Sequence, residues 1–219
     1  MKLVQTLDKS FTVYSESIGE NYHSINGAVT ESMHVFINAG FNYAGKGTVT
    51  ILEAGLGTGL NALLTLFGSL SSGRSVKYYA IELYPLDHEI LKGLHYKDYC
   101  ESQYQTVDFF SRIHDCEWGR DVEITKGFIL HKINGDIKST DFPDGIELVY
   151  YDAFSPLKQP ELWSLDIFEK LYKKMLPGAV LTTYCVKGEI KRTLKTAGFT
   201  IEKLPGPPGK REMLRAIKC

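Results

Sequence analysis

The chain has 219 residues, of which 43% are hydrophobic, and a formal net charge of −1. This size suits one α/β domain with a small extension, and the near-zero charge gives no whole-molecule field that would attract nucleic acid. No apolar run reaches the roughly 20 residues that span a bilayer. The four cysteines form no Cys-x-x-Cys pair, and the six histidines lack metal-ligand spacing. The sequence therefore predicts a cytoplasmic protein with reduced thiols, no membrane segment and no metal site.

Residues 1–46 are predicted to form a hairpin and a helix ahead of the main domain. Residues 11–14 alternate weakly, as in a short strand, and apolar residues recur at helical spacing over 27–39. A hairpin that covers the core is the simpler interpretation, and a segment that lies over a cofactor pocket is the alternative. Glu31 and His34 are three residues apart on this helix, where a solvated polar face is the default explanation.

A glycine-rich turn follows the first strongly apolar strand. The strand 49–53 ends on a carboxylate, Glu53, and Gly55, Gly57 and Gly59 then alternate before a helix begins. Glycines allow a sharp turn and let a ligand approach the main chain closely. The free N–H groups at the start of a helix favour polar or anionic ligand groups. This stretch therefore predicts a ligand-binding turn between a strand and a helix.

Three loop types compete as explanations of this turn. The dinucleotide fingerprint Gly-x-Gly-x-x-Gly fails because Leu60 stands where the third glycine is required. The phosphate-binding pattern Gly-x-x-x-x-Gly-Lys-Ser/Thr at 40–47 fails because Gly47 ends it and because it precedes the strand. The remaining pattern, Glu-x-Gly-x-Gly-x-Gly, is similar to motif I of the class I S-adenosylmethionine (SAM) methyltransferases. A glycine turn that binds no ligand is the alternative.

Acidic residues also mark the ends of the next predicted strands. Glu82 and Asp152 end the strands 76–82 and 147–152, and Asp136 follows the strand 128–133. The carboxyl ends of parallel strands are where open α/β sheets bind ligands. At Glu82 a carboxylate can accept hydrogen bonds from both ribose hydroxyls of an adenosine ligand. In SAM sites an acidic or amide group at the loop of Asp136 commonly faces the adenine amino group. Ordinary strand-end or turn carboxylates are the alternatives.

Strands and helices alternate along the rest of the chain. Right-handed crossovers between such units imply a parallel sheet, and a final hairpin adds one antiparallel strand at or near its edge. The prediction is an α/β protein with the Rossmann-like class I methyltransferase fold, a seven-stranded, mostly parallel sheet with one antiparallel strand, plus a small N-terminal extension. Residues 115–126 are charged and predicted to be a turn region. The predicted strands are 49–53, 76–82, 128–133, 147–152, 179–184, 199–204 and 213–217, and the predicted helices are 60–70, 85–94, 99–113, 163–172 and 189–197.

Several stretches together identify a family. They are Asp-Ala-Phe-Ser-Pro at 152–156, Pro-Glu-Leu-Trp at 160–163, the glycine loop at 53–61, Gly-Lys-Arg-Glu-Met at 209–213, Tyr-His-Ser at 22–24 and Thr-Glu-Ser-x-His-Val-Phe at 30–36. With these motifs the chain resembles the methyltransferase domain of the MnmC family along almost its whole length. The first two motifs are specific, whereas the glycine loop alone would identify only the cofactor.

This resemblance implies transfer of a methyl group from SAM to the primary amine of 5-aminomethyl-(2-thio)uridine at the wobble position of the tRNA anticodon loop. Bifunctional members carry a second, FAD-dependent oxidoreductase domain, which is absent from this chain, so a stand-alone methyltransferase is expected. Residues 1–46 are then the extension that covers the cofactor site, and 47–219 the SAM-dependent methyltransferase domain. The alternatives are a methyltransferase of a small-molecule amine and a non-catalytic SAM-binding module. The oligomeric state is left open.

Site residues follow from the chemistry and the resemblance. A primary alkylamine is largely protonated near neutral pH, and only the neutral amine attacks a sulfonium methyl group. We therefore expect Asp152 to anchor the ammonium and accept its proton. The expected cofactor residues are Gly55, Gly57, Gly59 and Asn61 of the turn, Glu53 for the polar end of the methionine part or for a bound water, Glu82 for ribose, Asp136 for adenine, and Tyr22 and Phe154 over the sulfonium. The expected substrate residues are Ser155, Pro156, Lys210 and Arg211.

Basic residues concentrate toward the C-terminus. A solvated helix face and an edge strand explain most of them, and a local surface for tRNA phosphates is also compatible. They are Lys187, Lys191, Arg192, Lys195, Lys203, Lys210, Arg211, Arg215 and Lys218.

Overall fold

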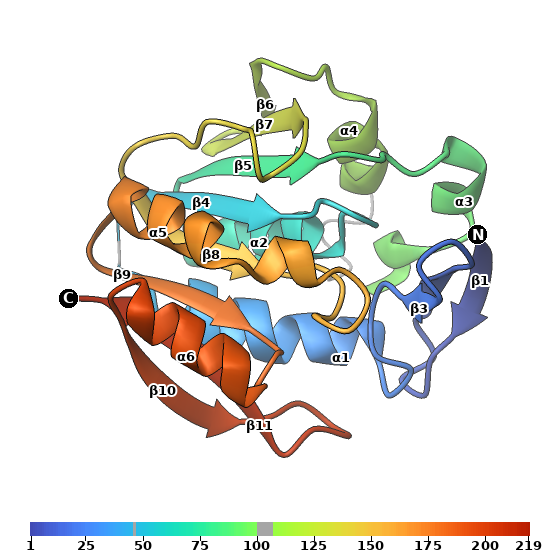
Figure 1. The fold of residues 1–219 in the computed structure, drawn as a ribbon. Coiled ribbons are helices and arrows are strands. Elements are labelled where there is room, and N and C mark those ends of the chain that lie inside the picture. The colour runs from blue at the N-terminus through green and yellow to red at the C-terminus, as the bar shows by residue number, and fades with distance from the viewer. Residues whose placement is uncertain (46, 100–106) are drawn as a thin grey trace.

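The computed structural model describes residues 1–219 except 46 and 100–106. A large sheet forms its centre, and helices cover both faces of the sheet (Figure 1). The strands of this sheet are β4 (Val49–Ala54), β5 (Val76–Glu82), β6 (Asp121–Thr125), β7 (Phe128–Asn134), β8 (Ile146–Tyr151), β9 (Met175–Thr183), β10 (Phe199–Pro205) and β11 (Glu212–Lys218).

The strand order is β10-β11-β9-β8-β4-β5-β7-β6. Strands β9, β8, β4, β5 and β7 pair in parallel, and β11 lies antiparallel between β9 and β10. The predicted α/β class and mostly parallel sheet are confirmed, and β11 is the expected antiparallel strand.

The predicted count of seven strands is wrong, because the sheet has eight. The additional strand is β6, which pairs antiparallel with β7 at the sheet edge and adds a second antiparallel strand. It lies in the segment predicted to be a charged turn. Of its five residues, Ile124 alone is buried, whereas Asp121 and Glu123 are exposed. An edge strand with this pattern lacks the apolar run that marks the buried strands of a parallel sheet.

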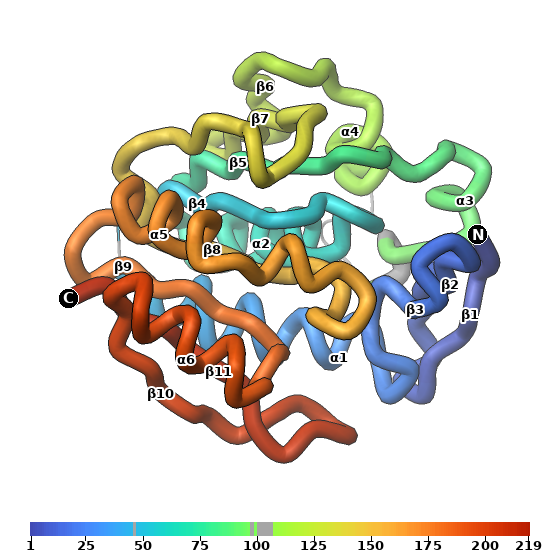
Figure 2. The backbone as a smooth tube through the Cα atoms, viewed as in Figure 1, coloured from blue at the N-terminus to red at the C-terminus, as the bar shows by residue number. Residues whose placement is uncertain are grey.

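Helices pack on the two faces of the sheet, and Figures 1 and 2 show α5 and α6 on one side and α1 and α2 on the other. Tyr150 and Tyr151 are neighbours on β8 and belong to the two opposite cores, as the alternation of side chains along a strand requires. The helical elements are α1 (Ala28–Ser32), η1 (Met33–Phe41, a π-helix), α2 (Leu60–Ser72), α3 (His88–Lys92), η2 (Tyr96–Tyr99), α4 (Phe109–Asp115), η4 (Pro160–Trp163), α5 (Leu165–Lys174) and α6 (Gly188–Thr196). The helix predicted over 99–113 falls partly outside the described residues.

The N-terminal segment forms a small sheet and then a helix. Strands β1 (Lys2–Gln5), β2 (Phe11–Ser15) and β3 (Glu20–Asn21) pair antiparallel beside the carboxyl ends of β4 and β5 (Figure 1). The following α1 and η1 pack on the central sheet, where the Phe36 ring lies 5.2 Å from that of Tyr150. Residues 28–41 therefore contribute to the core of the α/β unit, and the division at 46/47 stays a prediction.

Neither a membrane-spanning helix nor a cluster of metal ligands is found in residues 1–219 other than 46 and 100–106. None of the helices in this part of the chain combines the length and apolar composition that crossing a membrane requires. The same residues contain no group of three or more His, Cys, Asp or Glu side chains placed to hold a metal ion.

Candidate functional site

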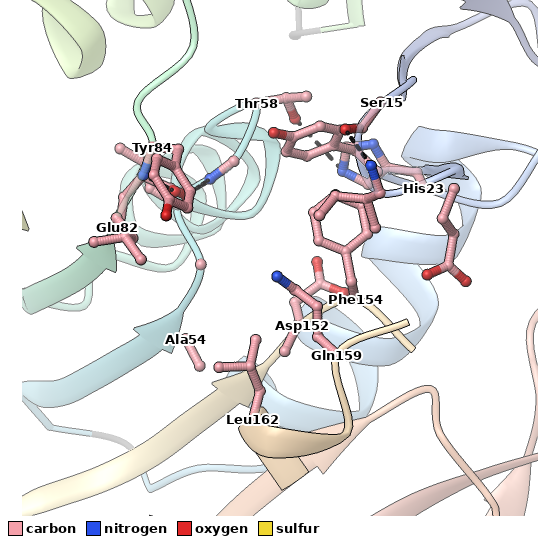
Figure 3. Close-up of a pocket in the computed structure, with 18 of the residues that line it drawn as sticks. Ser15, His23, Ala54, Thr58, Glu82, Tyr84, Asp152, Phe154, Gln159 and Leu162 are labelled. Atoms are coloured by element: carbon pink, nitrogen blue, oxygen red, sulfur yellow. Dashed lines mark hydrogen bonds between the residues drawn. The ribbon is translucent and has the colours of Figure 1, made fainter. Parts of the chain in front are cut away.

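A cavity of about 760 Å³ opens at the carboxyl ends of β4, β5 and β8 (Figure 3). The glycine turn and the N-terminal segment between Ser15 and Ile25 contribute to its wall. Figure 3 shows Glu82 and Tyr84 on one side of the cavity and Asp152 on the other. The cavity therefore lies at the sheet edge where the sequence places the acidic strand ends.

The alternating glycines of the turn have backbone conformations that other residues rarely adopt. Gly55, Gly57 and Gly59 have φ angles of 92°, 51° and 73°. A Cβ atom on Gly57 would lie 3.0 Å from Cδ1 of Tyr22, and one on Gly59 would lie 2.6 Å from Nε2 of His114. The turn therefore needs glycine both for its torsion angles and for the space that packed side chains leave.

Replacing Gly59 with alanine is expected to lower the free energy of unfolding by about 1–3 kcal/mol, since strain and crowding add. Gly73 offers a matched control, because its φ of 69° is similar and a Cβ atom there would have no other atom within 4 Å. Chemical denaturation of Gly59→Ala and Gly73→Ala compares the two. If both variants lost the same unfolding free energy, crowding against His114 would make no contribution to the loss in Gly59→Ala.

The carboxylates that border the cavity are held by backbone groups. Glu82 accepts hydrogen bonds from the N–H groups of Gly57 at 2.9 Å and Tyr84 at 2.8 Å. Asp136 accepts one from the N–H of Lys138 at 2.9 Å and forms an ion pair with its Nζ at 3.2 Å. A carboxylate has about four acceptor positions. Both side chains are therefore fixed and keep capacity to accept further donors.

One amide joins two carboxyl groups beside the turn. Nδ2 of Asn61 donates to Oε1 of Glu53 at 3.0 Å and to Oδ2 of Asp152 at 2.9 Å. Burial raises the pKa of Glu53 well above its usual range and that of Asp152 to about 8. Oε2 of Glu53 and Oδ1 of Asn61 are buried and have no hydrogen-bond partner among the described residues, and the hydroxyl of Tyr78 lies close enough to Glu53 to influence its pKa. Oδ1 of Asn61 can therefore accept a further donor, while the raised pKa of Glu53 favours its neutral form.

The loop after β8 is locked in place by three hydrogen bonds to its backbone. Asp152 begins this loop, so the bonds also fix the position of its carboxyl group. The ring of Phe154 packs edge-on against Tyr22, with 4.9 Å between the ring centroids. The three bonds run from Tyr184 Oη to the Ala153 carbonyl at 2.9 Å, from Trp163 Nε1 to the Phe154 carbonyl at 2.8 Å, and from the Ser155 N–H to Glu20 Oε2 at 3.0 Å.

Two histidines near the turn, His23, which is buried, and His114, which is partly buried, are poorly suited as proton acceptors. His23 bonds to Thr12 through Nδ1 at 3.1 Å, and His114 contacts the Thr58 carbonyl through Nε2 at 3.1 Å. Burial lowers the pKa of each to about 4. The pKa of Asp152, at about 8, is better matched to proton transfer near neutral pH.

Most of the predicted site residues border the cavity, although no bound ligand tests their roles, which stay predictions. Glu53 and Gly59 do not line it, and neither do Ser155, Pro156 and Arg211. The predicted residues that do line it are Tyr22, Gly55, Gly57, Asn61, Glu82, Asp136, Asp152, Phe154 and Lys210.

The solvated face proposed for Glu31 is wrong. Its side chain is 8% exposed, and its Oε1 accepts a hydrogen bond from Nζ of Lys210 at 2.6 Å. Its Oε2 accepts one from the N–H of Ser24 at 2.8 Å. Sequence reasoning also missed Glu20 and Tyr184 in the cavity wall. The signal for Glu31 was its place in the family-like stretch 30–36.

Comparison with known proteins also indicates a SAM-dependent methyltransferase. A family model described as S-adenosyl-L-methionine-dependent methyltransferase matches residues 102–219. The bifunctional protein MnmC of tRNA 5-methylaminomethyl-2-thiouridine biosynthesis from Cupriavidus metallidurans is 32% identical, over 94% of this chain and 32% of that protein. The MnmC of an Azoarcus species is 30% identical, over 93% and 34%. The chain thus spans about a third of the length of these curated relatives.

Solved structures agree on the fold. MNMC2 from Aquifex aeolicus superposes with a TM-score of 0.77 at 24% identity, covering 99% of this chain and 70% of that one. DesVI from Streptomyces venezuelae gives a TM-score of 0.50 at 12% identity, covering 87% and 92%. The family match extends over more than half of the sequence. The chain belongs to the S-adenosyl-L-methionine-dependent methyltransferases.

Proposed function

We propose that this protein transfers a methyl group from SAM to the primary amine of 5-aminomethyl-(2-thio)uridine at the wobble position of the tRNA anticodon loop. The observation that carries the proposal is the Asp152 carboxyl group, which borders the cavity on a locked loop and has a pKa near neutrality. The names of the MnmC relatives supply the substrate class. A cytoplasmic location, where tRNA is found, is part of the proposal.

The residues of the cavity fit SAM, which carries an adenosine, an amino acid and a sulfonium. The backbone of Gly55 and Gly57 is open to close approach, and Glu82 retains acceptor capacity for ribose hydroxyls. Asn61 lines the cavity, and its unpartnered Oδ1 suits an ammonium group, whereas Oε2 of Glu53 lies behind the lining and suits an ordered water. We assign the remaining contacts to Asp136 for adenine, and to Tyr22 and Phe154 for the sulfonium. When bound, SAM supplies an electrophilic methyl group.

Asp152 has two roles in the proposed reaction. As a carboxylate it holds the substrate ammonium, and it then accepts the proton that this nitrogen must lose before its lone pair can form the new N–C bond. The locked loop keeps Asp152 in one position, so that orientation contributes to the rate. When the substrate ammonium and the sulfonium of SAM bind, their positive charges favour the ionised form of Asp152. The pKa of Asp152 then falls below its value of about 8 in the free protein.

The proposal predicts a specific dependence on pH. With a pKa of about 8, Asp152 in the free protein is increasingly protonated as the pH falls below this value, so kcat/KM should rise with pH and level off above about pH 8. The rise in kcat should lie at lower pH, because kcat reports the complex, in which bound cations favour the carboxylate. Steady-state methyl transfer from pH 6 to 9 measures both profiles, over roughly the range in which this group titrates. Coincident profiles, or rates that fall across this range, would contradict the assignment.

Ion pairs in the C-terminal region reduce the number of basic side chains that are free to contact tRNA phosphates. Ion pairs occupy Lys203 with Glu212 and Arg215 with Glu202. Arg211 is exposed and has no ion pair within the described residues. It lies on the hairpin turn that also carries Lys210, which borders the cavity. We therefore propose Arg211 as a phosphate contact.

Reversing this charge with Arg211→Glu is expected to weaken tRNA binding and to reduce the slope of log K against log salt by about 1. Lys126→Glu makes the same change in charge at an exposed turn on the opposite edge of the sheet and should leave the slope as it is. Filter binding across a salt series measures both variants. Equal slopes for Arg211→Glu and Lys126→Glu would exclude a contact at this turn.

The function is tested by labelled methyl transfer to tRNA that carries the 5-aminomethyl base. The control is the same tRNA after chemical acetylation of its primary amine, which removes the attacking lone pair and the positive charge. Label should enter the untreated tRNA and not the acetylated one. Label in both would place the methyl group elsewhere on the RNA, and label in free alkylamines but in neither tRNA would point to a small-molecule substrate.

A further inference from the structure

Lys210 places a primary alkylammonium group inside the cavity. Its Nζ lies 2.6 Å from Oε1 of Glu31 and 4.0 Å from the centroid of the Tyr184 ring. All three residues border the same cavity as Asp152. Chemically, the group at the end of Lys210 is the same as the aminomethyl group of the proposed substrate. The contacts of Lys210 therefore show what this cavity offers to an ammonium ion.

The two groups that hold this ammonium are fixed by other bonds. Glu31 is buried, and its second oxygen accepts the N–H of Ser24. Tyr184 donates its hydroxyl hydrogen to the Ala153 carbonyl at 2.9 Å. A carboxylate and an aromatic face, both held in place, form a cage that binds an alkylammonium by charge, hydrogen bonding and cation–π attraction. Neither contact depends on Lys210 for its position.

The lysine, by contrast, is free to leave. Its side chain is 32% exposed, and it extends from the turn between β10 and β11 on a flexible four-carbon stem. Displacement of Nζ by a competing ammonium therefore requires rotation of this side chain. The cage therefore has an occupant that a competing ammonium can displace.

The cage also adjoins the proposed proton acceptor. The negative charge of Glu31 raises the pKa of Asp152, and the positive charge of Lys210 lowers it, so both groups lie within electrostatic reach of that carboxyl. An ammonium that replaces Lys210 would sit in the same field. Its proton could then pass to Asp152 once the nitrogen is oriented for attack.

We propose that Glu31 and the ring of Tyr184 form the subsite for the substrate's alkylammonium group, and that Lys210 fills this subsite in the free protein until substrate displaces it. The inference rests on the proposed function in one respect, that the substrate is a primary amine. Glu31 is then a positioning residue that selects a charged aminomethyl group over a neutral hydroxymethyl group. Lys210 acts as an internal competitor that keeps the buried carboxylate neutralised when no substrate is present.

The test uses benzylammonium as the probe and benzyl alcohol as its neutral counterpart, in calorimetric titrations at pH 7. Removing the competitor with Lys210→Met should tighten benzylammonium binding at least about tenfold, if Lys210 fills the subsite for at least about nine-tenths of the time. Binding of benzyl alcohol should not change. Lys210→Arg retains a competing cation and should show no gain.

A second substitution tests whether the tighter binding of benzylammonium depends on Glu31. In Lys210→Met/Glu31→Gln the tighter binding of benzylammonium should disappear, because the carboxylate that attracts the cation is gone. SAM titration and thermal unfolding of each variant confirm that it is folded. Glu31→Gln alone provides an independent reading, since it should raise KM for the amine substrate more than it lowers kcat. The subsite is overturned if Lys210→Met does not bind benzylammonium more tightly, or if the tighter binding persists in Lys210→Met/Glu31→Gln.

The outcomes for the subsite and for the proposed function are separable. Competition between Lys210 and benzylammonium without methylation of tRNA would support the subsite and overturn the tRNA substrate. Methylation of the tRNA amine without any gain in Lys210→Met would support the function and overturn the subsite.

Discussion

The Asp152→Asn variant is expected to lose about 10²- to 10⁴-fold in kcat for methyl transfer, the range that a positioned proton acceptor contributes. Asparagine preserves the size of the side chain and can still bond with Asn61, which contacts Asp152 at 2.9 Å. It cannot carry the negative charge that holds an ammonium, and it cannot accept the proton. SAM affinity should change by less than about threefold, because the proposed cofactor contacts lie mainly on other residues.

Asp144 provides the matched control for this change. It makes an ion pair with Lys174 and its side chain is 87% exposed. Asp144→Asn removes the same charge away from the cavity and should leave kcat as it is. Single-turnover transfer of labelled methyl and a SAM titration measure the two effects separately. A full kcat in Asp152→Asn would remove this residue from the mechanism.

The Glu82→Gln variant is expected to weaken SAM binding by about 10- to 100-fold. Hydrogen bonds to a charged acceptor contribute about 1.5–3 kcal/mol each, and the change removes the charge. It also turns an NH₂ group toward a cluster in which Gly57 and Tyr84 already direct N–H groups at this side chain. The NH₂ group of the glutamine then faces one of these backbone N–H groups without an acceptor between them. This repulsion disturbs the glycine turn as well as the ribose contact.

Glu123 is the corresponding control, because it is an exposed glutamate on the edge strand β6. Glu123→Gln should bind SAM as the unmodified protein does. Titration calorimetry with SAM provides the comparison, and circular dichroism confirms that both variants are folded. If SAM bound equally well to Glu82→Gln, the ribose assignment would have to move to another residue.

The central sheet was predictable because its strands are buried on both faces. Strands such as β4 and β8 read as largely apolar runs, with Glu53 as the last residue but one of β4 and Asp152 directly after β8, and helices with apolar spacing separate the strands. The strand β6 was missed for the opposite reason. With Ile124 as its single buried residue, its sequence carries the charge pattern of a turn, and its pairing with β7 is a tertiary event.

The parts of the site that short stretches of sequence encode were predictable. The glycine turn and the strand-end acids Glu82 and Asp152 are recognised from their places along the chain, and the fold brings them to one cavity. The Glu31–Lys210 pair joins residues 179 positions apart, so no local pattern could indicate it. Helical spacing placed Glu31 on a polar face, but the hairpin turn that covers this face buries it.

The central claim is most directly tested by mass spectrometry of nucleosides from tRNA that carries 5-aminomethyl-2-thiouridine, after incubation with the protein and SAM. The account predicts that 5-methylaminomethyl-2-thiouridine appears while the unmethylated nucleoside falls by the same amount, and that Asp152→Asn slows the conversion by about 10²- to 10⁴-fold. A methyl group on any other nucleoside, or no product from protein that binds SAM, would contradict it.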